Sequence, residues 1–217
     1  MNVTPRAFVP APANAIPVWL HAPTEIVQRL LDTLQNYQFT GSLRGRMVLG
    51  LASVVLEQQH AIVLLLRTRL NSAALALARA VTESLLKTQW MQSYATDEQV
   101  ERLSEGVQEF PDLTRLIADV MAGDAVEGAW WAQWKLDNYR IVCDYAHTGR
   151  IQVSYWFNGN MVEPTHPVDE LQTLAAHSTM LALLAAVCIA DAASDASLLA
   201  RVNEHLDWFK DRLVWAS

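Results

Sequence analysis

The chain has 217 residues and a formal net charge of −7, with 52% apolar and 18% charged residues. That length and apolar content suffice for one domain with a hydrophobic core, and the acidic balance argues against a non-specific nucleic-acid coat. We find neither an apolar run of the roughly 20 residues that a membrane span needs nor a signal-peptide pattern, so we expect a cytoplasmic protein that does not contact a membrane. Cys143 and Cys188 lie in apolar helical patterns and are expected to be free, buried thiols.

The charge is uneven along the chain. Residues 1–94 carry eight Lys/Arg against four Asp/Glu, and residues 95–217 carry eight against nineteen. One local basic groove built by the first half is therefore compatible with the acidic total.

The first half of the sequence predicts an arm followed by three helices. Five of the eight prolines fall in residues 1–23. Because proline lacks an amide donor and fixes its own φ, this arm is predicted to be extended. Thr24 is predicted to cap a helix up to residue 37. A long apolar helix is predicted over 43–69, and Asn71-Ser72 is predicted to cap the next helix, over 73–94.

The second half predicts further helices interrupted by a hairpin. An acidic helix over 96–106, a helix over 111–123 and an aromatic-rich helix over 126–147 come first. Apolar and polar residues then alternate from Ile151, and Asn158-Gly159 follows, which predicts a two-stranded hairpin near 151–163. An almost wholly apolar helix over 168–193 should be central, and an amphipathic helix ends near residue 214. The fold class is all-α, a single-domain bundle of about six to eight helices over 24–217 with one small β-hairpin insertion.

One stretch concentrates polar chemistry in this apolar chain, from Tyr139 to Gly149. Seven residues separate Arg140 from His147, which is about two helical turns, so both side chains lie on one face. Asp144 shares that face because it lies four residues after Arg140 and three before His147. Thr148-Gly149 is predicted to end the helix, since glycine tolerates the left-handed position beyond a helix end.

Two segments resemble an uncharacterised family of bacterial helical proteins. One runs Ser72-Ala-Ala-Leu-Ala-Leu-Ala-Arg79-Ala-Val-Thr-Glu83-Ser and on to Trp90-Met91; the other is Asp144-Tyr-Ala-His147-Thr-Gly149 followed by Gln152. With the helix order, the likeness covers residues 40–165. That family is in turn similar to the HEPN superfamily of helical bundles, many of whose members are metal-independent ribonucleases of toxin or phage-defence systems.

The HEPN resemblance implies a specific site. Its motif is an arginine, four to six further residues and a histidine, which Arg140 and His147 match at the upper limit. The residue after the arginine is usually polar in those enzymes and is Ile141 here. The resemblance implies that Arg140 and His147 cleave RNA without a metal or cofactor, and that two such motifs meet across a homodimer. Asp144, on the same face, completes the candidate catalytic set.

The same residues also fit a structural role. A histidine near a helix C-terminus suits the helix dipole, and Arg140–Asp144 has the spacing of an ordinary ion pair. A polar cluster between two helices can line a ligand pocket or only fix helix register; its candidate members are Arg79, Glu83, Asp144, Tyr145 and His147.

Two other patterns were weighed. Glu57-Gln-Gln-His60 has the ligand spacing of a bundle metal site but has no second copy, so no metal site is predicted. Four tryptophans suit base stacking, but at helical spacing such residues more often belong to a core or an interface; they are Trp130, Trp131, Trp134 and Trp156.

Two functions follow as hypotheses. The first is a HEPN-like endoribonuclease of a toxin or phage-defence system, acting on RNA as a homodimer and held in check by an antitoxin or another partner protein. The alternative is a non-catalytic helical module that binds a small ligand or a protein. The basic first half favours the ribonuclease, and the acidic total with Ile141 favours the module.

Overall fold

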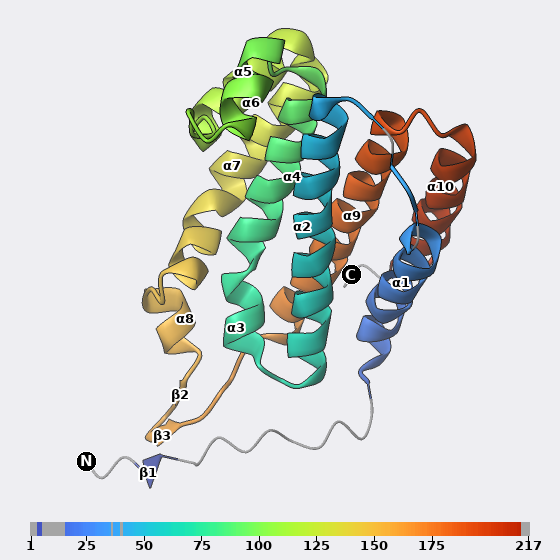
Figure 1. Cartoon of the computed structure of the whole chain (residues 1–217). Coiled ribbons are helices and arrows are strands. Elements are labelled where there is room, and N and C mark those ends of the chain that lie inside the picture. Colours follow the sequence, from blue (N-terminus) through green and yellow to red (C-terminus); the bar gives the residue numbers. More distant parts are fainter. Residues whose placement is uncertain (1–3, 6–15, 36, 40, 214–217) are drawn as a thin grey trace.

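The computed structural model describes residues 4–5, 16–35, 37–39 and 41–213. Within them the chain forms a helical bundle with one small sheet, which confirms the all-α fold class with a small hairpin (Figure 1). The helices are α1 (Val18–Leu34), α2 (Leu43–Arg67), α3 (Asn71–Ala76), α4 (Ala78–Ser93), α5 (Asp97–Ser104), α6 (Leu113–Gly123), α7 (Ala125–Ala146), α8 (Arg150–Ser154), α9 (Val168–Ala192) and α10 (Ala196–Lys210). The strands are β1 (Thr4–Pro5), β2 (Phe157–Asn158) and β3 (Met161–Val162).

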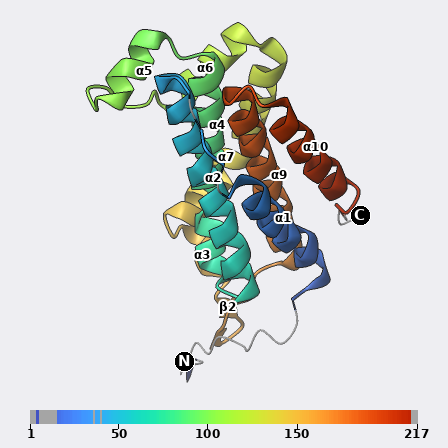
Figure 2. The ribbon, with the colours of Figure 1, turned by 45° about the vertical axis from the view of Figure 1, so that its right-hand side comes forward.

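The core lies where α2, α4 and α9 pack together. Helix α9 is apolar on nearly every side and contributes the largest set of buried residues, as its pattern predicted. Helices α1 and α10 cover one side of this centre (Figure 2), and α7 packs on the other side, against α4 (Figure 1). Helices α5 and α6 lie at one end of the bundle, while α3, α8 and the sheet lie at the other (Figure 1).

Two helices are long and apolar enough to cross a membrane, judged by length and composition. They are α2 and α9, which pack against each other at the centre of the bundle. In the most apolar window of α9, 67% of the residues are buried inside the bundle, against 33% for α2. Polar residues interrupt the apolar runs of both helices in the sequence, which is why the sequence alone predicted no membrane span. A long apolar helix fits a bundle core as well as it fits a bilayer.

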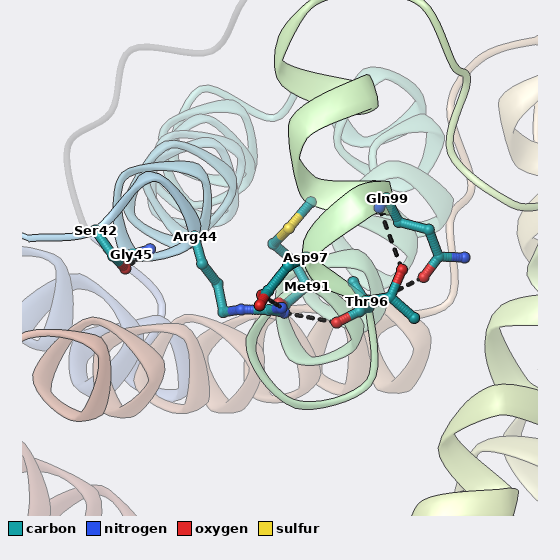
Figure 3. Close-up of polar contacts among 8 residues, drawn as sticks. Ser42, Arg44, Gly45, Met91, Thr96, Asp97 and Gln99 are labelled. Atoms are coloured by element: carbon teal, nitrogen blue, oxygen red, sulfur yellow. Dashed lines mark hydrogen bonds and ion pairs between the residues drawn. The ribbon is translucent and has the colours of Figure 1, made fainter.

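Arg44 ties the α5 end of the bundle together (Figure 3). Its Nη1 donates at 2.8 Å to the carbonyl oxygens of Met91, in the last turn of α4, and of Ala95, just beyond the helix, and its Nη2 reaches Asp97 at 2.6 Å. The last carbonyls of a helix have no partner within the helix, so a cation from α2 satisfies them. Helix α5 begins near residue 96, as its sequence predicted, and its start is a capping box formed by Thr96 and Gln99.

Helix α1 begins earlier than predicted. It starts at Val18 and continues through Pro23, and the hydroxyl of Thr24 donates to the carbonyl of Leu20 instead of capping the helix. The prediction of an extended arm up to residue 23 was therefore wrong for residues 18–23; the part of the arm at 1–3 and 6–15 lies outside the described residues. Pro23 is buried, and packing of the apolar face outweighs the lost amide bond.

The predicted helix over 73–94 is in fact two helices. The amide of Leu77 bonds the carbonyl of Ala74 at 3.1 Å, three residues back, so a tighter turn separates α3 from α4. Small residues on both sides of the break give no sequence signal for it. The break gives α3 its own contacts with α7.

The hairpin is shorter than predicted. Residues 150–154, whose alternation predicted a strand, form α8, and the antiparallel pair is confined to β2 and β3, with β1 added in parallel beside β3. The turn at Asn158-Gly159 was predicted correctly, and Gly159 has a φ of +60°. The reason for α8 lies in Asp144, whose carboxylate bonds the amide of Gln152 at 3.1 Å and so caps this short helix from the preceding one.

Candidate functional site

Arg79 joins two helices at the predicted site. From the start of α4, its Nε donates to Glu83 Oε1 at 2.7 Å, and its Nη1 lies 3.0 Å from Nε2 of His147. Its guanidinium carbon is 5.4 Å from the centre of the Tyr139 ring, within range of a cation–π contact. The structure thus brings Arg79, Glu83 and His147 together although the first and last are 68 residues apart.

The electrostatics of this cluster keep Arg79 charged. The hydrogen bond that Arg79 donates to Glu83 is the largest influence and raises the pKa of Arg79 further. Burial raises the pKa of Tyr139, a hydrogen bond with Cys143 adds to this, and the cation of Arg79 opposes it. Because a guanidinium only donates, its bond to Nε2 requires a lone pair there, which assigns the ring proton of His147 to Nδ1.

His147 is exposed at the C-terminal end of α7, and Arg140 is exposed two turns earlier. Arg140 forms no ion pair with any carboxylate in the described part of the chain, so the i,i+4 pair expected with Asp144 does not form. Asp144 instead turns towards α8, where Oδ1 accepts the bond from Gln152. The structure therefore places the three residues of the predicted face in three different environments.

The turn after α7 differs from the sequence interpretation. Thr148 has the left-handed conformation, with a φ of 53°, whereas Gly149 has a φ of −76°. A β-branched residue rarely adopts the left-handed region. Glycine at position 149 has another role, because a Cβ there would overlap the carboxylate of Asp144 and force that side chain to move.

Tyr145 belongs to a separate cluster. It is buried and donates to Glu170 Oε2 at 2.5 Å, and Tyr155 donates to the other oxygen of the same carboxylate. Burial first, and then the bond to Glu170, raises the pKa of Tyr145, so both phenols stay protonated. This arrangement ties α7, the α8 turn and α9 together, and it lies beside a pocket of about 320 Å³ that also contains His177.

Sequence reasoning missed some of the polar contacts. Tyr139, Cys143 and His147 recur every four residues on α7, a spacing that signals one face, but only His147 was assigned a role. Ser72 was predicted to cap a helix, whereas its hydroxyl lies 2.9 Å from Nε2 of His166 and accepts a bond from the indole of Trp156 at 3.0 Å. No local pattern connects residues so far apart. Among the described residues, no three His, Cys, Asp or Glu side chains gather as a metal site requires.

The sequence model of one protein family, described as a family of unknown function (DUF6988), matches residues 52–214. The chain belongs to this family. The DUF6988 match covers both halves of the candidate site, from Arg79 to His147. No curated protein and no solved structure matches the chain. The likeness to HEPN proteins stays a hypothesis that depends on the motif and the helical context.

Proposed function

We propose that this DUF6988 protein is a HEPN-like, metal-independent endoribonuclease of a bacterial toxin or phage-defence system. One observation carries the proposal: the exposed imidazole of His147 is held 3.0 Å from a guanidinium that Glu83 fixes in place. An imidazole beside a guanidinium combines a proton carrier with an anchor for phosphate. Arg140 adds a second cation, on α7 about two turns before His147; it is exposed and forms no ion pair among the described residues.

The proposed chemistry is transesterification of the RNA backbone. A phosphate bound to Arg79 takes over its N–H groups and frees Nε2 of His147, which then accepts the proton of the 2′-hydroxyl. The 2′-oxygen attacks phosphorus, and the bond to the 5′-oxygen breaks as that oxygen receives a proton. The products are a 2′,3′-cyclic phosphate and a 5′-hydroxyl end. The two arginines stabilise the charge of the transition state.

A homodimer belongs to the same proposal, because the HEPN resemblance implies that two motifs meet at an interface. Helix α7, which carries Arg140, also exposes large apolar side chains, and exposed apolar surface favours association. They are Val126, Trp130, Leu136 and Ile141. A second copy docked along α7 would supply the acid that protonates the leaving oxygen. A cytoplasmic location and an antitoxin or other partner protein complete the proposal.

The second candidate is a non-catalytic binding module. It is favoured because the members of the cluster already have hydrogen-bond partners in one another: Arg79 bonds both Glu83 and His147. Such a cluster can fix α4 against α7 without any reaction. The pocket of about 320 Å³ between α7 and α9, lined by Trp134 and His177 among others, would then hold the ligand.

RNA cleavage separates the two. Purified protein is incubated with end-labelled single-stranded RNA in the presence of EDTA, and we expect cleavage that leaves 2′,3′-cyclic phosphates. His147→Ala should reduce the rate by at least about 100-fold, the scale of a lost general base. His60→Ala, which removes an exposed imidazole on α2, is the matched control and should cleave as the wild type does. Intact RNA after incubation with concentrated wild-type protein, or equal cleavage by His147→Ala, would rule out the nuclease.

A further inference from the structure

A second pocket lies beside the Arg79–His147 pair. Its volume is about 290 Å³, and it opens between α3 on one side and the α7–α8 turn with Trp156 on the other. Ala76, in its wall, is three residues before Arg79, and Thr148, also in its wall, directly follows His147. Arg79 and His147 do not line the pocket themselves, but its wall residues are close to both along the chain, so an occupant would lie within a few residues of the group proposed to do chemistry.

The wall of this pocket is fixed by hydrogen bonds that converge on Ser72. The indole of Trp156 donates to its hydroxyl at 3.0 Å, and His166 contacts the same oxygen at 2.9 Å. The amide Nε2 of Gln152 donates to the carbonyl of Ser72 at 2.8 Å. Because these bonds hold Trp156 against α3, a ligand need not order the ring on binding, which is where much affinity is otherwise lost.

The lining matches the two faces and the edge of a flat heterocycle. Trp156 offers an aromatic ring, and the methyl groups of Ala73 and Ala76 lie on the α3 side, where a longer side chain would fill the space. Polar groups of Thr148 and Gln152 share the wall. Unpaired bases in RNA are bound in this way, by stacking on an aromatic ring with hydrogen bonds to the base edge.

The four tryptophans that suited base stacking have different environments. Trp131 and Trp134 are buried in the core, where Trp134 also lines the pocket of about 320 Å³, and Trp130 is half exposed on α7. Trp156 lines the pocket between α3 and the α7–α8 turn. Arg150 starts α8, is exposed and forms no ion pair with the described residues, so it is available to the phosphates that flank a bound base.

We propose that this pocket is a nucleobase subsite that holds one unpaired base of RNA next to the phosphate bound at Arg79 and His147. That the biological ligand is RNA rests on the proposed function, whereas the binding of a nucleobase in this pocket does not. A base held here sets which phosphate reaches His147, so the pocket determines the sequence preference of cleavage. The small residues Ala73 and Ala76 determine how large a base it accepts.

Binding of mononucleotides tests the subsite without catalysis. Isothermal titration calorimetry measures the affinity of the wild-type protein for the 5′-monophosphates of adenosine, guanosine, cytidine and uridine, with inorganic phosphate as a separate ligand. At least one nucleotide should bind more tightly than phosphate. Ala73→Leu fills the pocket from an exposed helix position. It should lower the affinity for that nucleotide at least about 5-fold, the lower limit for a lost base–aromatic stack, and leave the affinity for phosphate unchanged. Ala200→Leu, at an exposed alanine of α10, should change neither.

The outcomes separate this subsite from the nuclease. Nucleotide binding that Ala73→Leu weakens, in a protein that leaves RNA intact, would keep the subsite and remove the nuclease. RNA cleavage that depends on His147 but keeps its cut positions in Ala73→Leu, with no mononucleotide bound better than phosphate, would overturn the subsite and keep the nuclease. Equal weakening by Ala73→Leu and Ala200→Leu would also overturn it.

Discussion

The contact between Asp144 and Gly149 gives a sharp test of what this carboxylate does. Asp144 shares a predicted helical face with the candidate catalytic residues, yet its Oδ1 accepts a bond from the Gln152 amide at 3.1 Å and acts as a cap for α8. We expect Asp144→Ala to cost about 1 kcal/mol of unfolding free energy, the usual value for a lost cap. Gly149→Ala should cost about 2 kcal/mol, because the new Cβ displaces the carboxylate and because alanine is a poor residue at the N-cap position that Gly149 occupies before α8.

The two substitutions should not be additive. Gly149 has a φ of −76°, which alanine adopts freely, so the steric part of the Gly149→Ala effect comes from Asp144 alone. In the Asp144→Ala background that part disappears, and the double variant should be about 1 kcal/mol more stable than the sum of the single effects. Urea unfolding with equal slopes measures the three differences, and hydrogen exchange at the Gln152 amide should show lost protection in each variant.

The reasoning would be refuted by additive effects, since those would mean that Asp144 does not occupy the space beside Gly149. A second result would also contradict it. If Asp144→Ala abolished RNA cleavage while the Gln152 amide stayed protected, the carboxylate would belong to the reaction and not to the cap. Loss of cleavage together with lost protection would instead mean that α8 positions the site.

Three further predictions concern stability. Arg44→Met breaks three hydrogen bonds and should lower the free energy of urea unfolding by about 2 kcal/mol. Asp97→Asn, at a carboxylate with 93% of its side chain exposed, should lower it by under about 1 kcal/mol. Equal costs would mean that the ion pair matters more than the carbonyl bonds. Gly128→Ala should destabilise the protein by about 2 kcal/mol because the new Cβ would overlap the α6 backbone. Gly50→Ala, in open space on α2, should stabilise it by about 0.5–1 kcal/mol. The melting temperatures measured by calorimetry should therefore shift in opposite directions. Burial lowers the pKa of His177 to about 4, below the 6.5 of the unfolded chain, so the unfolded state binds more protons between these pH values. The free energy of unfolding should therefore fall by up to about 3 kcal/mol as the pH drops from about 6.5 to 4. His177→Gln should flatten most of that slope, and an unchanged slope would mean that another group titrates.

The long helices were predictable because their signals are local. Apolar residues repeat with the helical period in α2 and α9, and side-chain caps mark the starts of α2, α6 and α10 at Ser42, Asp112 and Asp195. The errors arose where a distant residue overrides the local pattern. Alternation from Ile151 predicted a strand, but a carboxylate in the preceding helix caps that segment into α8. Likewise, a threonine before a glutamate predicted a helix start at a point where α1 already runs through Pro23.

The candidate site was only partly predictable for the same reason. Helical spacing correctly places Arg140 and His147 on one helix, but it says nothing about which side chain approaches from another helix. Arg79 does so across 68 residues of sequence, and Asp144 turns away although its spacing predicted an ion pair. Local spacing therefore finds candidates on one element, whereas the contacts that decide their chemistry depend on tertiary packing.

The net charge of −7 is a poor guide to what approaches His147, because the field at a site depends on the nearest charges. Residues 97–112 carry six carboxylates against one arginine, and they belong to the α5–α6 end of the bundle (Figure 1). The α8 turn lies at the other end of the bundle (Figure 1). There the exposed guanidinium groups of Arg140 and Arg150 have no ion-pair partner among the described residues, while Asp144 is bonded to a backbone amide and Glu170 to two phenols. An anionic ligand therefore meets unpaired cations at this end, in a protein whose total charge would repel it.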